Sequence, residues 1–185
     1  MKRAEALRMA IEIAPDDALW VLCNGRIGRE AFSIRDRPQH FYMMGSMGLG
    51  LSIALGLALA QPARKVLCVD GDANVLMNLG VVATVAARAP ANLHHLILDN
   101  EAHGSTGGQA TISNVVPIEA VAAACGWAWS RRAGSDLEQA LGELFATAGP
   151  SCLLVKVDPA DLPGIPRISR SPRQIADAFR SGLAQ

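Results

Sequence analysis

The chain has 185 residues, half of them hydrophobic, and its 17 basic and 17 acidic residues give a formal net charge of zero. A chain of this length can bury a sizeable core in one domain, and its neutrality gives no electrostatic reason to bind nucleic acid or an anionic membrane. The longest apolar run, 49–60, is too short and glycine-rich to span a bilayer, and charges interrupt residues 1–17, where a signal peptide would be apolar. We therefore expect one soluble domain over residues 1–185.

Helical and strand-like apolar runs alternate along the whole chain. Small and apolar residues recur at helical spacing over 3–13, and the run ALWVLC at 18–23 has the character of a short buried strand. In chain order after it, helices are expected over 29–34, 49–60, 74–88, 117–125, 135–148 and 171–184, and strands over 65–69, 94–98, 127–130 and 152–157. This alternation predicts an α/β fold, with a mostly parallel sheet and helices on both faces.

The end of the chain, 159–185, is expected to be a connector followed by a helix. Three prolines lie within 158–166, which argues against regular structure there. The arginines of this region are expected on a solvated or subunit-facing surface. They are Arg167, Arg170, Arg173 and Arg180.

The four cysteines are far apart in the sequence, at Cys23, Cys68, Cys125 and Cys152. No pair has the spacing of a zinc motif or a disulfide framework. Three lie in apolar, strand-like runs, where a free cysteine usually packs as a small hydrophobic residue. Free, isolated thiols are typical of a reducing compartment, so a cytoplasmic location is expected.

Polar side chains follow two of the expected strands. The strand at 65–69 leads into Gly71-Asp72-Ala73-Asn74, and the strand at 94–98 leads into Asp99-Asn100-Glu101-Ala102. A single Asp-Gly or Asp-Asn after a strand usually marks only a turn or a helix cap. Two such runs, at strand ends that meet at one edge of a parallel sheet, favour a shared ligand. Their oxygen donors suit Mg²⁺ carried on a phosphate, and a helix starting at Asn74 would point its amides at that anion.

A glycine-rich bend occupies 41–50, with Gly45, Gly48 and Gly50 among three methionines. Glycine lets the backbone approach a ligand, and methionine adapts to a flat heterocycle. Close packing between a helix and a sheet selects the same small residues, so both interpretations stay open. The order GxxGxG is not that of the dinucleotide-binding fingerprint.

The loop after Asn100 continues through His103 to Gln109. A polar loop of this kind can order over a substrate, although it can also be a simple solvent-exposed connection. His94 and His95 lie at a strand entrance, away from the edge where ligands bind, so we expect them to be structural.

With these residues identified, the chain resembles the pyrophosphate-binding domain of thiamine-diphosphate-dependent enzymes, and most closely the sulfopyruvate decarboxylase beta subunits and phosphonopyruvate decarboxylases. The resemblance covers roughly residues 18–158. The motif of that family, GDG followed by NN, stands here as Gly71-Asp72-Ala73 and Asp99-Asn100. Ala73 departs from the third glycine, and Asp99 departs from the first asparagine, which in this family does not bind the metal.

The resemblance implies that Asp72, Asn100 and the Ala102 carbonyl hold Mg²⁺, which binds the diphosphate of the cofactor. It places the aminopyrimidine at the Gly45 carbonyl and the Met47 amide, with the Met47 side chain beneath the bent cofactor. The implied cofactor-binding residues are Asn24, Gly25, Gly45, Ser46, Met47, Gly71, Asp72, Ala73, Asn74, Asn100, Ala102, His103 and Gly104. His103, Ser105, Thr106 and Gln109 are the candidates for facing a 2-oxo acid substrate.

In this family a glutamate that activates the cofactor comes from a second, pyrimidine-binding domain. The resemblance therefore implies an alpha subunit as partner, in a hetero-oligomer with a dimeric core.

Two other functions remain open. One is the beta subunit of another split thiamine-diphosphate enzyme, acetolactate-synthase-like or a 2-oxoacid oxidoreductase, although the latter usually carries cysteine clusters for iron–sulfur centres. The other is a non-catalytic phosphate- or nucleotide-binding module, which Ala73 would support.

Overall fold

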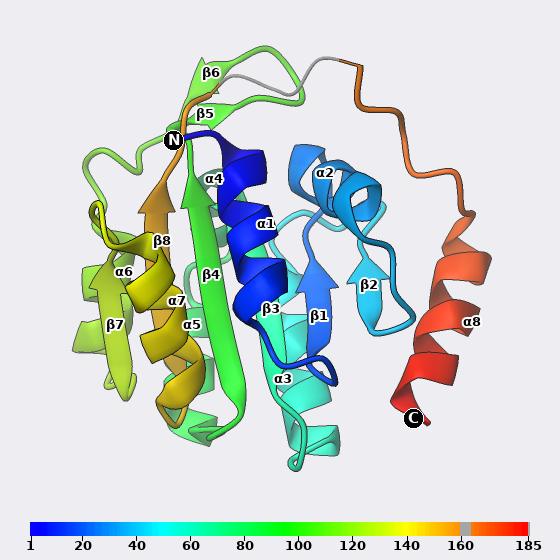
Figure 1. Cartoon of the computed structure of the whole chain (residues 1–185). Helices are drawn as coiled ribbons and strands as arrows, with labels where there is room; N and C mark the ends of the chain where they lie inside the picture. The colour runs from blue at the N-terminus through cyan, green and yellow to red at the C-terminus, as the bar shows by residue number, and fades with distance from the viewer. Residues whose placement is uncertain (160–163, 185) are drawn as a thin grey trace.

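A six-stranded sheet forms the centre of the molecule in the computed structural model, which describes residues 1–159 and 164–184 (Figure 1). Every pairing in this sheet is parallel, and the strand order is β2-β1-β3-β4-β8-β7. The strands are β1 (Leu19–Leu22), β2 (His40–Tyr42), β3 (Val66–Gly71), β4 (Leu93–Asp99), β7 (Trp129–Arg132) and β8 (Ser151–Lys156). The predicted α/β fold with a parallel sheet is confirmed.

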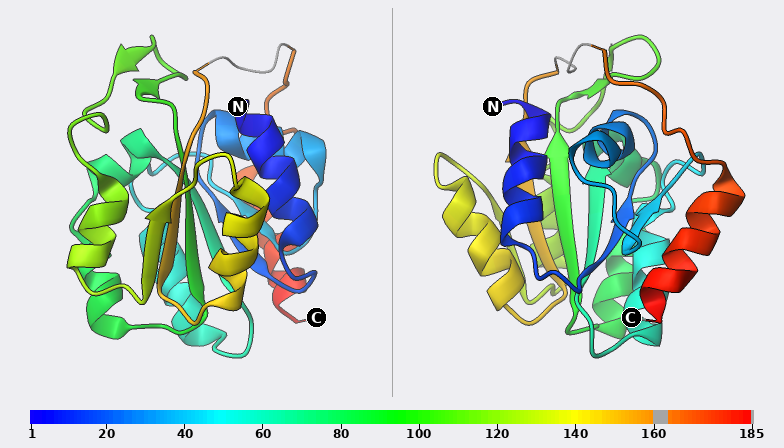
Figure 2. Two further views of the ribbon diagram at one scale, coloured as in Figure 1. Left: turned by 60° about the vertical axis from the view of Figure 1, so that its left-hand side comes forward. Right: turned by 45° about the vertical axis from the view of Figure 1, so that its right-hand side comes forward.

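Helices cover both faces of the sheet, as Figure 2 shows. One layer holds α1 (Arg3–Ile13), α2 (Arg26–Ile34) and α7 (Leu137–Ala146), and the other holds α3 (Gly50–Ala60), α4 (Asp72–Met77), α5 (Val81–Arg88) and α6 (Ile118–Ala124). The last helix, α8 (Pro172–Leu183), lies beside the edge strand β2, where Phe179 and Phe41 pack with ring centroids 5.4 Å apart. Among the described residues, no helix has the length and apolar character needed to cross a membrane.

The strands are apolar without interruption because both faces are buried. In β1, Trp20 and Leu22 join the core beneath α1 and α7, while Leu19 and Val21 join the core beneath α3 and α5. Alternate side chains of a strand point to opposite faces, so a strand covered on both sides needs apolar residues at every position. Cys23, Cys68 and Cys152 are buried as expected, and Cys125 is partly buried.

Three local predictions were wrong or incomplete. The single helix predicted over 74–88 is two helices, because Asn78 leaves the helical conformation (φ −143°) and its side chain donates instead to Gly48 O. The short strand β2 was not predicted, nor was the hairpin of β5 (Ala102–His103) and β6 (Gln109–Ala110). Segments of two or three residues are too short for hydrophobic periodicity to reveal them. Residues 160–163, inside the predicted connector, lie outside the described part of the chain.

The chain topology places a binding site at the upper edge of the sheet in Figure 1. From β1 the chain passes to β2 on one side, and it then returns to β3 on the other side of β1. Connections that diverge in this way leave a crevice at the carboxyl ends of the two strands, which is where open α/β sheets bind ligands.

Candidate functional site

Three oxygen atoms meet just beyond the carboxyl ends of β3 and β4. Asp72 is the first residue of α4, Asn100 follows β4, and Ala102 begins β5. The amide oxygen of Asn100 lies 3.2 Å from Asp72 Oδ1 and 2.9 Å from Ala102 O. With the amide turned over, its nitrogen would donate a hydrogen bond to both of these atoms. The site therefore suits a cation bound between three oxygens. Without a cation, it suits the other orientation of Asn100, in which the side-chain N–H donates to the two remaining oxygens.

The spacing of these oxygens matches a small divalent cation. Mg²⁺ binds oxygen at about 2.0–2.1 Å in octahedral geometry, so adjacent ligands lie about 2.9 Å apart. A carboxylate, an amide oxygen and a main-chain carbonyl are ligand types that Mg²⁺ accepts. The residues present fit the ion that the sequence implied.

Burial raises the pKa of the Asp72 carboxyl, and the negative charge of Asp99 acts in the same direction. Hydrogen bonds oppose this rise, above all the one that Thr111 Oγ1 donates to Asp72 Oδ2 at 2.5 Å. Thr111 also contacts Ser113 Oγ at 3.0 Å, and Ser113 donates to Asp99 Oδ1 at 2.8 Å. Two hydroxyl groups in contact with one another thus lie between the carboxylates of Asp72 and Asp99, each within donating distance of one of them.

Asp99 shapes the turn after β4 and is not directed at the oxygen cluster. Its Oδ1 accepts a hydrogen bond from Glu101 N at 3.0 Å, and Lys156 Nζ lies 2.6 Å from its Oδ2. Glu101 has a φ of 57°, a left-handed conformation that costs a non-glycine residue about 1 kcal/mol. The Asp99 carboxylate therefore supports a strained turn that leads to the Ala102 carbonyl.

Ala73 has helical backbone angles as the second residue of α4, and it is absent from the non-glycine residues with positive φ. A third glycine is not required by the backbone at this position. The substitution in the family motif is therefore no reason to expect a degenerate site.

The turn at 45–48 is fixed to α4 through Gly48. Gly48 N donates to Asn74 Oδ1 at 2.7 Å, and Asn78 Nδ2 donates to Gly48 O at 3.0 Å. Gly48 has a φ of 91°, which only glycine adopts readily, and a Cβ on Gly50 would lie 2.9 Å from Asp70 Oδ1. Packing thus explains these two glycines, while Gly45 faces open space with nothing within 4 Å of its would-be Cβ.

One cavity at this edge brings most of the predicted residues together. It is lined by Arg3, Cys23, Asn24, Gly25, Arg26, Ile27, Met47, Gly71, Asp72, Ala73, Asn74, Leu98, Asn100, Ala102, His103, Gly104, Ser105 and Thr106. Gly45 and Ser46 lie in the adjacent exposed turn, and Gln109 is directed at Thr106 Oγ1 (3.0 Å) rather than into the cavity. Asn24 Oδ1 is buried here and has no hydrogen-bond donor among the described residues.

Two arginines in the cavity wall were missed by the sequence analysis. Arg26 follows the predicted Asn24-Gly25 turn directly, so its position after the strand was an available signal. Arg3 lies on α1, where its guanidinium makes two hydrogen bonds, of 2.9 and 2.6 Å, to the buried Glu30. Nothing in the sequence near residue 3 marks it as part of a site formed by later strands.

The two strand histidines are buried and structural, as expected. His94 Nδ1 lies 2.8 Å from Ser151 Oγ, and burial, helped by the charge of Lys65, lowers the His94 pKa to about 4. His95 Nε2 lies 3.1 Å from Asp70 Oδ2.

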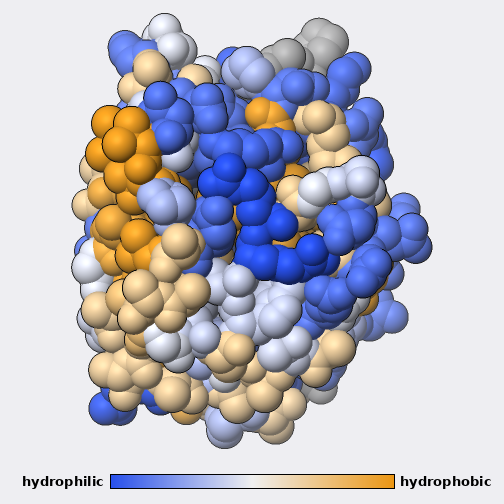
Figure 3. Space-filling view, turned by 90° about the vertical axis from the view of Figure 1, so that its left-hand side faces the viewer, coloured by the Kyte–Doolittle hydropathy of each residue, from blue (hydrophilic) through white to orange (hydrophobic). Residues whose placement is uncertain are grey.

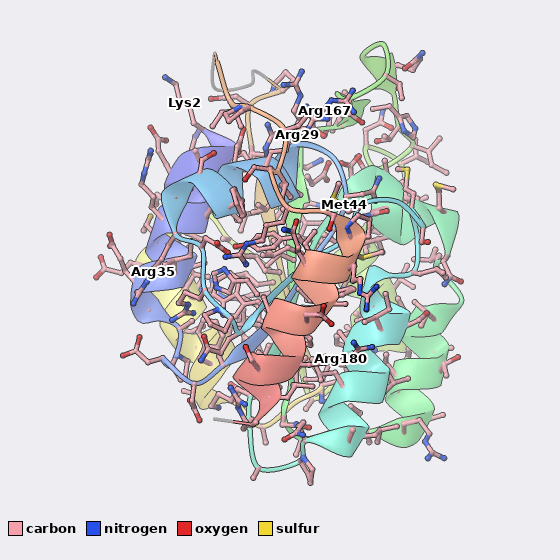
Figure 4. All side chains as sticks on the ribbon, turned by 90° about the vertical axis from the view of Figure 1, so that its right-hand side faces the viewer. Lys2, Arg29, Arg35, Met44, Arg167 and Arg180 are labelled. Carbon is pink, nitrogen blue, oxygen red and sulfur yellow. The ribbon has the colours of Figure 1, made fainter. Side chains whose placement is uncertain are left out.

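The tail arginines lie on the surface, where Arg170 pairs with Asp36 and Arg180 pairs with Asp177. Figure 4 shows Arg180 on α8 and Arg167 on the segment before it.

Comparison with known families agrees with this geometry. Residues 23–155 match the family described as "Thiamine pyrophosphate enzyme, C-terminal TPP binding domain". The chain belongs to this family. Its matched region begins at the carboxyl end of β1 and ends within β8, so it contains the oxygen cluster and the turn at 45–48.

Several relatives of the chain are decarboxylases by name, and others are acetolactate synthase large subunits. The chain is 45% identical to a phosphonopyruvate decarboxylase of Streptomyces viridochromogenes, over 97% of this chain and 45% of the relative. It is 41% identical to a sulfopyruvate decarboxylase subunit beta of Methanothermobacter thermautotrophicus, over 97% of this chain and 94% of that subunit. The chain thus spans somewhat less than half of the first relative and nearly all of the second.

The fold is also found in a solved enzyme structure. The crystal structure of benzoylformate decarboxylase from Polynucleobacter necessarius superimposes with a TM-score of 0.75 at 19% identity, over 88% of this chain and 34% of that one. At this level of identity the likeness concerns the fold alone.

Proposed function

We propose that this chain is the beta subunit of a Mg²⁺- and thiamine-diphosphate-dependent decarboxylase, which converts sulfopyruvate or phosphonopyruvate to the corresponding aldehyde and CO₂. The observation that carries this proposal is the cluster of three oxygens from Asp72, Asn100 and Ala102 inside a thiamine pyrophosphate-binding domain. The names of the relatives support the choice of substrate class.

In this proposal the chain holds the diphosphate end of the cofactor. Asp72, Asn100 and the Ala102 carbonyl coordinate Mg²⁺, and the main-chain amides of Ala73 and Asn74 face the phosphate oxygens. Asn24 and Gly25 approach from the end of β1, where the Asn24 side chain has an unused oxygen and lies in the same cavity. A Mg²⁺ ion held by these residues would reduce the negative charge of both the diphosphate and the buried Asp72, which would offset part of the cost of burying them.

The turn at 45–48 holds the other end of the cofactor. Met47 lines the cavity, and its backbone is fixed on the C-terminal side by the two hydrogen bonds of Gly48. When bound, thiamine diphosphate supplies the thiazolium that accepts the electron pair left by CO₂. The chain supplies orientation, with His103, Ser105 and Thr106 of the hairpin region available as donors to a substrate.

A pyrimidine-binding alpha subunit completes the site, in a cytoplasmic hetero-oligomer with a dimeric core. Among the residues that line the cavity, Asp72 is the only carboxylate, and the metal uses it. The glutamate that activates the cofactor must then come from another domain. The relative named subunit beta, matched over 94% of its length, supports a separate partner chain.

The test is reconstitution with the candidate alpha subunit of the same organism. The complex with thiamine diphosphate and Mg²⁺ should release CO₂ from sulfopyruvate or phosphonopyruvate, while pyruvate, which lacks the anionic tail, serves as the comparison substrate. The chain alone should show negligible turnover.

Rapid decarboxylation by the isolated chain would refute the need for a partner. Calorimetry tests the alternative of a non-catalytic module, because such a module would bind no thiamine diphosphate even in the complex. Turnover of pyruvate in preference to the two anionic substrates would favour the other alternative, an acetolactate-synthase-like subunit.

A further inference from the structure

Asp70 is a buried carboxylate beside the site that the proposed function leaves without a role. It is 3% exposed, lies in β3 two residues before Asp72, and is not among the residues that line the cavity. Its Oδ1 accepts a hydrogen bond from Asn74 Nδ2 at 3.0 Å. Its Oδ2 lies 3.1 Å from His95 Nε2 and 3.3 Å from Cys68 Sγ. Asp70 thus accepts hydrogen bonds from Asn74 and Cys68 and lies within hydrogen-bond distance of the His95 ring.

The carboxylate determines which way the Asn74 amide points. Because Asp70 Oδ1 accepts the hydrogen bond from Asn74 Nδ2, the Asn74 side-chain oxygen points the other way. That oxygen then accepts from Gly48 N at 2.7 Å. These contacts connect His95, Asp70 and Asn74 to the turn at 45–48, with Asn74 donating to Asp70 and accepting from Gly48.

The turn needs such support because its backbone is strained. Ser46 has a φ of 57° and Gly48 a φ of 91°, on either side of Met47. A left-handed conformation at a non-glycine residue persists only where surrounding contacts hold it. Asp70 also lies directly below the first residue of α3, since a Cβ on Gly50 would come within 2.9 Å of its Oδ1. One carboxylate thus contacts the start of α3 and, through Asn74, the turn before it.

We propose that Asp70 is a positioning residue for the cofactor. Through Asn74 it fixes the turn at 45–48 relative to Asp72, so the pyrimidine end and the diphosphate end of thiamine diphosphate are held by one rigid unit. The inference rests on the proposed function, because it assigns the turn to the pyrimidine. Loss of Asp70 should therefore weaken binding of the pyrimidine end of the cofactor and leave binding of the metal and the diphosphate unchanged.

The test compares two ligands on the complex of this chain with its pyrimidine-binding subunit. Isothermal titration calorimetry in saturating Mg²⁺ gives the Kd for thiamine diphosphate and for inorganic diphosphate, which lacks the pyrimidine. In Asp70→Asn the new amide can donate, so the Asn74 amide is no longer held in one orientation. We expect the Kd for thiamine diphosphate to rise about tenfold, the effect of one lost hydrogen bond, and the Kd for diphosphate to change less than about twofold.

A second variant and a matched control complete the design. Asn74→Ala removes the same link while keeping the main-chain amide, and it should give the same selective loss, with no further loss in the double variant. Ser151→Ala is the control, because it removes a buried contact of 2.8 Å with His94 at the opposite end of the sheet. It should leave both dissociation constants unchanged.

Three results would overturn the inference. They are an unchanged affinity of both single variants for thiamine diphosphate, an equal loss for both ligands, and additive losses in the double variant. A wild-type complex that binds diphosphate but not thiamine diphosphate would instead refute the proposed function, and this inference with it.

Discussion

Asp72 must lose its proton before it can coordinate a cation. Because burial raises the pKa of this carboxyl, protonation competes with metal binding at a higher pH than it would at an exposed aspartate, which has a reference value of 3.8. Thr111 partly counteracts the effect by donating to the carboxylate. The hydrogen bonds around Asp72 therefore adjust the pH range in which the site can hold Mg²⁺.

Mg²⁺ affinity should fall as the pH drops toward the raised pKa of Asp72, and binding in that range should release a proton. Titration calorimetry of the complex with thiamine diphosphate, in buffers of different ionisation enthalpy, measures both quantities. Asp72→Asn removes the titrating group and should abolish Mg²⁺-dependent cofactor binding. An affinity that stays constant from neutral pH to pH ~4 would contradict the assignment of Asp72 as a ligand.

Ala73→Gly restores the glycine of the family motif and should not improve cofactor binding. Position 73 already has helical angles, and glycine in a helix is less stable than alanine by about 0.5–1 kcal/mol. The expected result is a slightly lower free energy of unfolding in urea and an unchanged Kd for thiamine diphosphate. Tighter binding by Ala73→Gly would mean that the alanine side chain crowds the phosphates.

Among single residues, the sequence best predicted polar side chains that lie at the carboxyl ends of strands. Asp72 and Asn100 stand within three residues of the ends of apolar runs, so the parallel topology alone was enough to bring them together. Arg3 could not be found in this way, since its place in the cavity depends on how α1 packs against α2. Asp70 was equally hidden, because its proposed role depends on polar contacts with Asn74 and His95 and on its closeness to Gly50, which lie on three other segments.

Among the helices, α3 has an unusual composition for one that is partly exposed. There is no Asp, Glu, Lys or Arg from residue 38 to residue 63, or from 73 to 87. Yet Leu49, Ile53 and Leu59 are 46%, 37% and 45% exposed, and Met77 of the neighbouring α4 is 60% exposed. A helix that is apolar on all sides is normally covered. Figure 3, which views the side that carries β7 and α6, shows apolar residues gathered along one edge of the molecule.

This surface, whose α3 and α4 segments carry no charged side chain from 49 to 60 and from 73 to 77, is continuous with the turn at 45–48. Met77 and Asn78 lie against Gly48, next to Met47 in the cavity wall, and Met44 at the start of the same turn is 52% exposed (Figure 4). A partner that reaches the pyrimidine end of the cofactor would therefore meet α3 as well. We expect the pyrimidine-binding subunit of the proposed function to cover this surface.

Gly56→Arg should weaken binding of the pyrimidine-binding subunit by about 100-fold, because it places a charge in an apolar interface. Gly142→Arg on α7 is a matched control, since both glycines lie inside helices, neither has a positive φ, and a Cβ on either meets nothing within 4 Å. Sedimentation velocity of the separately purified chains measures the association. Equal binding by both variants, or loss of self-association alone, would place the partner elsewhere.

Element prediction succeeded for long periodic segments and failed where tertiary contacts set the boundary. The helices at 3–13 and 49–60 were predicted almost to the residue. The break between α4 and α5 was not, because Asn78 gives up the helix to bind Gly48 O, a contact across 30 positions of sequence. The hairpin of β5 and β6 has two residues per strand and carries no periodic signal.

For the molecule as a whole, buried histidines set the response to acid. Burial lowers the pKa of His94 to about 4 and that of His40 to about 3, from a reference of 6.5. Below pH 6.5 both histidines are protonated in the unfolded chain but remain neutral in the folded state. Stability is therefore lost as the pH falls from 6.5 toward 4, by up to about 1.4 kcal/mol per pH unit for each histidine.

Urea unfolding at pH 7 and pH 5 measures this loss. His94→Gln should unfold more easily at pH 7, where it loses native packing, but should show a smaller loss between the two pH values. The difference between variant and wild type in this pH-dependent loss of unfolding free energy gives the contribution of His94 alone. The raised pKa of Asp72, which makes the folded state more stable as the pH falls, affects both proteins equally and cancels. Equal losses in the two proteins would show that His94 is protonated in the folded state.

The path of hydroxyl groups from Asp72 through Thr111 and Ser113 to Asp99 also bears on how the site can change in evolution. An asparagine at position 99 would bring an amide that can donate hydrogen bonds, whereas the aspartate here accepts them from Ser113 and Glu101. Positions 99, 111 and 113 should consequently change together across descendants of a common ancestor. A lineage that exchanged one of the three alone would pass through an intermediate with a mismatched hydrogen bond beside its metal ligand.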